Sequence, residues 1–287
     1  MLGYPLDLIL AVATASATVF LGFLPTKSIS SSFFAREALV ATFLWAIVAF
    51  SAPAEAMHYM LAIGLFCGGA WWKFRHDRML NGKMWLSLSS GLGISLAVVL
   101  ILVKTPQGYP PELPSHIGGL LLASIYMGGS IIGLTYICFT LIQNVSTNSG
   151  VTQGVAQRYL KILFGLTLAR AAVLIALLFL PRPGFRPFLM SGTGGTMMGF
   201  SETEKAPEVG FFFGHAYVTE GMGSFPSINF TGSIILLLAL VVIALPGLAC
   251  AAMHASRMAS RVQPTRILIV LLLAACIAEI IARLVVL

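Results

Sequence analysis

The residues with the clearest chemical potential are Glu279 and Arg283, which lie in an apolar stretch over residues 267–287. They are four positions apart, so on a helix they share one face. A carboxylate inside a bilayer is costly unless it is paired, neutralised or hydrated. We therefore expect Glu279 to face the protein interior, where it could exchange a proton or lie beside a lipid-soluble quinone.

Arg170 is the predicted partner of Glu279. It lies in the apolar stretch 162–180, nine positions after Lys161 and twelve before Arg182. At about 1.5 Å of rise per residue, this places Arg170 near the middle of a membrane. The sequence leaves two interpretations open. The pair can be a structural clamp that, with Arg283, locks two helices together, or it can be a proton or quinone site.

A second candidate site is the segment Glu55-Ala56-Met57-His58-Tyr59, at the start of another apolar run. Glu55 and His58 are three positions apart and face the same way on a helix. An imidazole one to two turns into the membrane can donate a hydrogen bond to a quinone carbonyl and exchange a proton near neutral pH. Glu55 also has a structural explanation, because a carboxylate stabilises a helix N-terminus.

Histidines on facing helices could hold a haem instead, and His116 is expected at the same membrane side as His58. Spacing alone does not show such ligation, so the cofactor stays open, with a quinone as one candidate and haem as the less favoured one. No metal site is predicted. The chain has no Walker motif, no HExxH and no GxSxG, and its cysteines form no CxxC or CxxCH. Catalysis by this chain alone is therefore not expected.

The composition indicates an integral membrane protein. Hydrophobic residues make up 58% of the chain and charged residues only 9%, with a mean hydropathy of +0.93. These values exclude a soluble globular domain. The net charge of +7 comes from short loops between apolar runs, so it indicates topology and not a nucleic-acid partner. We expect the protein to lie among lipids in a bacterial cytoplasmic (inner) membrane.

The predicted fold is all-α: a polytopic membrane helix bundle of about eight transmembrane helices in a single domain over residues 1–287. Lys and Arg in the loops after the first, third, fifth and seventh runs number eleven, against four on the opposite side. The positive-inside rule therefore places both termini on the non-cytoplasmic side. The expected spans are 6–24, 37–52, 54–72, 84–103, 117–142, 159–180, 232–253 and 267–287.

Two further features bear on organisation. Gly129 and Gly133, four positions apart in the fifth run, predict a close helix contact.

The long non-cytoplasmic loop 181–231 is rich in Gly, Phe and Met, which is unusual for a polar linker. Loops of this length usually have a function. We expect it to cap the outer mouth of the bundle or to contact a partner subunit.

The sequence Ala278-Glu279-Ile280-Ile281-Ala282-Arg283 resembles a motif in the membrane-anchor subunits of DMSO reductase and the related polysulfide and nitrite reductases. The motif is an acidic residue, two apolar residues, any residue and Arg. The resemblance covers these six residues and a topology of about eight helices. It implies electron exchange between quinone and an attached iron–sulfur subunit. His58 is similar in kind to the quinone-site histidine of that family, although its neighbours differ.

The leading hypothesis is a non-catalytic integral membrane subunit of a quinone-linked electron-transfer complex, which anchors partner subunits. A quinone-facing cavity is part of this hypothesis, with Glu55, His58 and Tyr59 as outer contacts and Arg170 with Glu279 as the buried pair. One alternative is a proton-coupled small-solute transporter with Glu279 as the carrier. Another is a purely structural scaffold subunit of a larger membrane complex. The long loop 181–231 distinguishes these hypotheses. A loop that docks a partner subunit favours a role in a complex, and a loop that acts as a mobile lid favours transport.

Overall fold

The computed structural model describes residues 3–26, 29–51, 54–104, 115–147, 153–179, 235–256 and 262–286. Within these residues every regular element is helical, so the predicted all-α fold is confirmed for this part of the chain. The loop 181–231 lies outside the described residues. The helices are α1 (Gly3–Phe23), α2 (Ser31–Ser51), α3 (Ala54–Arg75), α4 (Met79–Lys104), α5 (Ser115–Thr147), α6 (Gln153–Phe179), the π-helix η5 (Ala239–Ala244), α8 (Leu245–Ala255) and α9 (Val262–Val286).

Each predicted span coincides with helical structure, apart from differences at the ends. One such difference concerns α2, which begins at Ser31 and not at residue 37. Ser30 precedes this helix, and its Oγ accepts a hydrogen bond from the backbone N–H of Phe33 at 3.4 Å. A serine in this position satisfies one of the free N–H groups of the first turn, which explains the earlier start.

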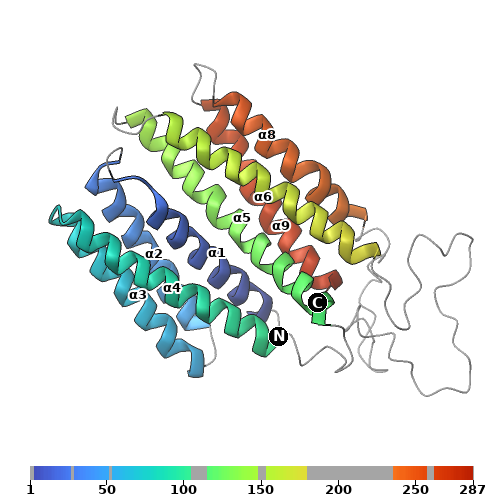
Figure 1. The fold of residues 1–287 in the computed structure, drawn as a ribbon, viewed down its shortest axis with the longest axis horizontal. Helices are drawn as coiled ribbons and strands as arrows, with labels where there is room; N and C mark the ends of the chain where they lie inside the picture. Colours follow the sequence, from blue (N-terminus) through green and yellow to red (C-terminus); the bar gives the residue numbers. More distant parts are fainter. Residues whose placement is uncertain are drawn as a thin grey trace, which may run out of the picture.

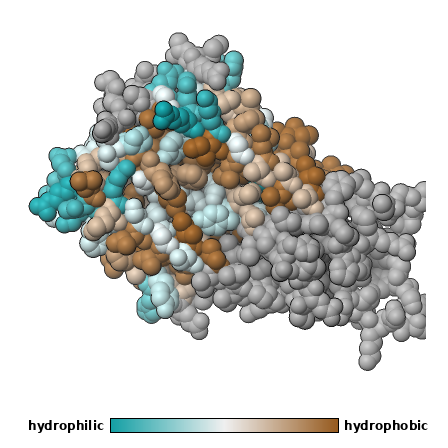
Figure 2. Space-filling view, in the orientation of Figure 1, coloured by the Kyte–Doolittle hydropathy of each residue, from teal (hydrophilic) through white to brown (hydrophobic). Residues whose placement is uncertain are grey.

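The protein is an integral membrane protein. Five helical segments in the described part are long and apolar enough to cross a bilayer, and large apolar side chains are exposed over the bundle. Figure 2 shows hydrophobic residues over much of the visible flank and hydrophilic residues gathered toward one end. The five segments are Ser31–Phe50, Ala123–Asn144, Gln153–Ala176, Ile235–Ala255 and Gln263–Ala282.

The helices form two groups, which we call the N-terminal half-bundle (α1 to α4) and the C-terminal half-bundle (α5, α6, η5 with α8, and α9), as Figure 1 shows. In the first, α3 packs between α2 and α4, and α1 contacts both α2 and α4. In the second, α6 and α9 each pack on α5 and on the rod formed by η5 and α8. The first turn of α1 and the last turn of α9 lie at the same end of the bundle (Figure 1).

The main contact between the half-bundles is α1 against α5. A Cβ placed on Gly133 would lie 2.8 Å from the backbone N of Ala17 and 3.2 Å from Cβ of Ser16, so only glycine allows this approach. Beside it, the hydroxyls of Ser16 and Ser130 share a hydrogen bond of 2.9 Å. The close contact predicted from Gly129 and Gly133 is therefore confirmed, and α1 is the helix that they meet.

The π-helix η5 has a local cause. Pro246 follows it within the first two residues of α8, and proline has no N–H to donate and clashes with the carbonyl one turn before it. Widening the preceding turn relieves that clash, and the backbone N–H of Leu245 accordingly donates to the carbonyl of Leu240, five residues earlier. Single π turns of this kind inside α-helices are frequent at functional sites.

Candidate functional site

The centre of the C-terminal half-bundle holds a buried ion pair between Arg170 of α6 and Glu279 of α9. The Nη2 group of Arg170 donates to Oε2 of Glu279, and each side chain is only 1% exposed. The predicted pairing of these two residues is confirmed. Because both charges lie inside a membrane-embedded bundle, each compensates part of the hydration that the other has lost.

Gly128 of α5 forms one wall of this pair. A Cβ at Gly128 would lie 2.7 Å from Cδ of Glu279 and 2.8 Å from Cζ of Arg170. The backbone of α5 therefore packs directly against both charged groups, and no other residue fits at position 128 without moving them. Since α6 and α9 also share the η5–α8 rod as a neighbour, the ion pair lies inside a ring of four helical segments.

The guanidinium group is only partly satisfied. Within the described part of the chain, Nε and Nη1 of Arg170 are buried and have no hydrogen-bond partner. A buried charged donor without an acceptor is costly, so such a group needs an explanation. The site can therefore donate hydrogen bonds to an acceptor.

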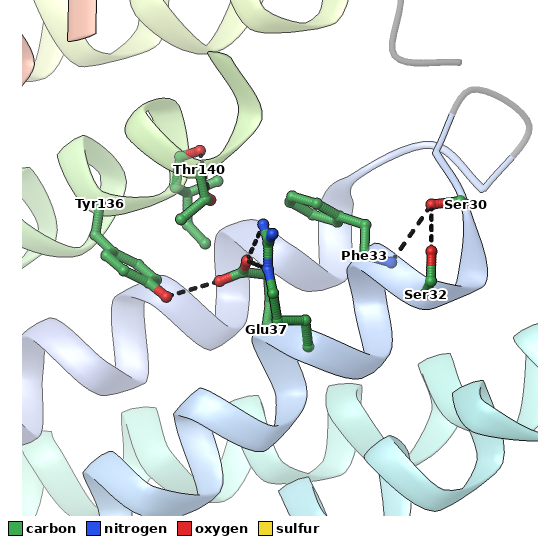
Figure 3. A network of polar contacts seen from close by, with 8 residues as sticks. Ser30, Ser32, Phe33, Glu37, Tyr136 and Thr140 are labelled. Carbon is green, nitrogen blue, oxygen red and sulfur yellow. Dashed lines mark hydrogen bonds and ion pairs between the residues drawn. The ribbon is translucent and has the colours of Figure 1, made fainter. Parts of the chain in front are cut away.

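A second buried carboxylate, Glu37 of α2, lies near the start of its helix. Its Oε1 accepts a hydrogen bond of 2.9 Å from Nε of Arg36 and lies 2.8 Å from Nη2 of the same arginine, in an ion pair. Its Oε2 accepts a 2.7 Å hydrogen bond from the hydroxyl of Tyr136, which reaches across from α5 (Figure 3). Glu37 thus joins the two half-bundles, while the guanidinium of Arg36 remains half exposed.

Replacing Tyr136 by phenylalanine should destabilise the protein by about 1.5–3 kcal/mol, the usual contribution of a hydrogen bond to a charged group. The loss is expected because Glu37 is buried and keeps one oxygen without its donor. Thermal unfolding of the purified protein in detergent measures this effect. Tyr59→Phe is the matched control, because Tyr59 is 68% exposed; equal effects of the two substitutions would contradict the role of the bridge.

Two other predicted site residues, His58 and Tyr59, are not brought to the ion pair. His58 and Tyr59 are exposed on α3, which packs on α2 and α4 in the N-terminal half-bundle. Glu55, His116 and Arg283 lie in α3, α5 and α9, but their side chains fall outside what the structure describes. A quinone or haem contact by His58 and a haem contact by His116 therefore stay predictions, as do the role of Glu55 beside His58 and that of Arg283 in a clamp with the ion pair. The described residues include no group of three or more His, Cys, Asp or Glu suited to a metal ion.

Sequence reasoning did not identify Glu37, Tyr136 or Gly128. The signal for Glu37 was present, since it follows Arg36 at the edge of an apolar run, but an acid beside a base at a membrane edge is usually solvated. Tyr136 and Gly128 carry no such signal. Their roles depend on which helices pack together, and hydropathy does not encode that.

No protein-family model matches the chain, and no curated protein or solved structure is significantly similar to it. No family is therefore assigned, and the resemblance of residues 278–283 stays a prediction.

Proposed function

We propose that this protein is a non-catalytic membrane subunit of a quinone-linked electron-transfer complex. In this proposal all eight predicted spans cross the membrane and both termini face away from the cytoplasm. The observation that carries it is the buried Arg170–Glu279 pair with its two unpartnered guanidinium nitrogens. The resemblance of the segment around Glu279 to quinone-linked membrane anchors points the same way.

Stability alone gives little reason for such a pair. Replacing a buried ion pair by apolar residues of similar volume is often neutral or stabilising. Ionisable groups inside membrane helices are instead associated with proton relays, ligand sites and ion pathways. A carboxylate beside free guanidinium donors suits the uptake of a proton and the binding of a quinone oxygen, which are the two requirements of quinone chemistry.

The proposed orientation rests on exposed basic residues. Arg75, Arg78, Arg158 and Arg266 are exposed near the end of α3 and the starts of α4, α6 and α9. In an up-and-down bundle these positions share the end opposite the first turn of α1. By the positive-inside rule that end faces the cytoplasm.

The test is purification of the protein with its native partners, followed by haem and iron–sulfur spectra and a quinol-oxidation assay. We expect redox-active partner subunits to co-purify, and quinol oxidation to fall in the double variant Arg170→Gln with Glu279→Gln, which removes both charges together, while the complex remains assembled. Lys161→Gln, at an exposed position of α6, is the control. A lone chain with no cofactor-bearing partner and no response to quinol would refute the proposal.

Proton-coupled transport is the second candidate, because the same buried carboxylate could carry a proton between the two membrane sides. Reconstituted liposomes distinguish it from the first. Proton-driven solute uptake that disappears in Glu279→Gln, without any redox partner present, would replace the electron-transfer proposal by this one.

A further inference from the structure

The two unpartnered donors of Arg170 point to a ligand at the centre of the C-terminal half-bundle. Arg170 is 1% exposed, so bulk water does not satisfy Nε and Nη1. Of the three guanidinium nitrogens, only Nη2 donates a hydrogen bond to Glu279. Nε shares one edge of the planar guanidinium with Nη2, and Nη1 shares another edge with Nη2. Because Glu279 already accepts from Nη2, each edge has one nitrogen left for a single acceptor atom. Neither edge is free for a bidentate carboxylate or phosphate.

The π turn η5 belongs to the rod that packs against α6 and α9, the two helices that carry the ion pair. It packs against both α6 and α9, and Val241 within it is fully buried. Val241 is six residues after Ile235, and Glu279 is seven residues before Val286, the end of an antiparallel helix. At about 1.5 Å per residue, the two positions lie at similar depth.

The same turn has a backbone acceptor to offer. Pro246 has no N–H, so one carbonyl of the preceding turn lacks its usual helical donor. In a membrane-embedded helix such carbonyls are satisfied by neighbouring side chains or by ordered water. Two free donors on α6 and one underused acceptor on the rod therefore lie at similar depth in the same ring of helices, while Gly128 closes the side toward α5.

We propose that this central site, formed by Arg170, Glu279, Gly128 and η5, binds a neutral oxygen ligand that accepts hydrogen bonds from Arg170. Two sources share this chemistry, namely an internal water and the carbonyl of a bound quinone; the second rests on the proposed function. An anion is disfavoured because Glu279 already neutralises Arg170. A cation is disfavoured by the guanidinium itself.

The experiment uses the full-length protein in lipid nanodiscs and three variants. Arg170→Lys keeps a positive charge for Glu279 but replaces the planar donors by a single nitrogen. Arg170→Gln combined with Glu279→Gln removes both charges together, as a second route should the first variant not fold. Pro246→Ala restores the backbone N–H and so removes the spare acceptor of the rod. Arg158→Lys, on an exposed arginine of the same helix, is the matched control.

Two measurements are made on each protein. Hydroxyl-radical footprinting with mass spectrometry reports oxidation of Val241 and Leu245, which are fully buried and can be labelled only by radicals formed from water beside them. Equilibrium titration with menadione, a short naphthoquinone, reports quinone binding. If the ligand is an internal water, we expect Val241 and Leu245 to be labelled in the wild type whether or not menadione is present. This labelling should be lost in Arg170→Lys and in Pro246→Ala.

A quinone carbonyl predicts instead that menadione binds the wild type and that its affinity falls by roughly 10- to 100-fold in Arg170→Lys, as for loss of a hydrogen bond from a charged donor. Pro246→Ala and Arg158→Lys should then bind it like the wild type. The proposed central site would be overturned if Val241 and Leu245 were not labelled and both Arg170 variants bound menadione as tightly as the wild type. The proposed function would still stand in that case, with the quinone bound elsewhere. Labelling without any menadione binding supports the water and counts against the proposed function.

Discussion

Replacing Glu279 by glutamine alone is expected to destabilise the protein by about 3–5 kcal/mol, the usual cost of removing one partner from a buried ion pair. The reason is the charge that stays behind. Arg170 is 1% exposed and donates to Glu279 through Nη2, so the amide would leave a buried cation without its counter-charge. Thermal or denaturant unfolding of the purified protein in detergent measures the loss.

The double variant Arg170→Gln with Glu279→Gln provides the internal control. It removes both charges and keeps a polar side chain at each position, so most of the lost stability should return. Lys161→Gln changes one charge at an exposed position of α6 and should have little effect. A single variant that is as stable as the double variant would mean that Arg170 reaches water or another anion, which contradicts the buried pair.

The ion pair was predictable because both residues interrupt long apolar runs. An ionised group near the middle of such a run must find a partner inside the protein, and few candidates exist. Arg170 and Glu279 were therefore paired from depth alone, and the helices that carry them followed from hydropathy. The same reasoning did not extend to Glu37, because a charge near the edge of a run can simply reach water at the membrane surface.

The arrangement of the helices was not predictable in this way. In lipid every helix is apolar on most of its surface, so the hydrophobic pattern does not distinguish a neighbouring helix from acyl chains. The division into two half-bundles, and the packing of Gly128 on the ion pair, depend on these unencoded contacts. His58 illustrates the limit: its position near the start of α3 was correct, but the structure leaves it exposed and away from α6 and α9.

Gly129 and Gly133 were informative because a small-residue pair at four-residue spacing has a geometric meaning that does not depend on lipid. The second large effect is therefore expected at Gly133. Alanine there should destabilise the protein by about 1–3 kcal/mol or more, the typical cost of overpacking a tight contact. The added Cβ would meet the backbone of α1 at Ala17, 2.8 Å away, and backbone cannot rotate aside as a side chain can.

Gly165→Ala in α6 is the matched control for this substitution, because a Cβ at Gly165 meets nothing within 4 Å. There the only expected change is a gain in helix propensity of up to about 1 kcal/mol, so the two variants should move stability in opposite directions. Unfolding in detergent measures both, and a cysteine cross-link between α1 and α5 should form less efficiently in Gly133→Ala. If both substitutions stabilised the protein, α1 and α5 would have to lie further apart than the Ser16–Ser130 hydrogen bond of 2.9 Å allows.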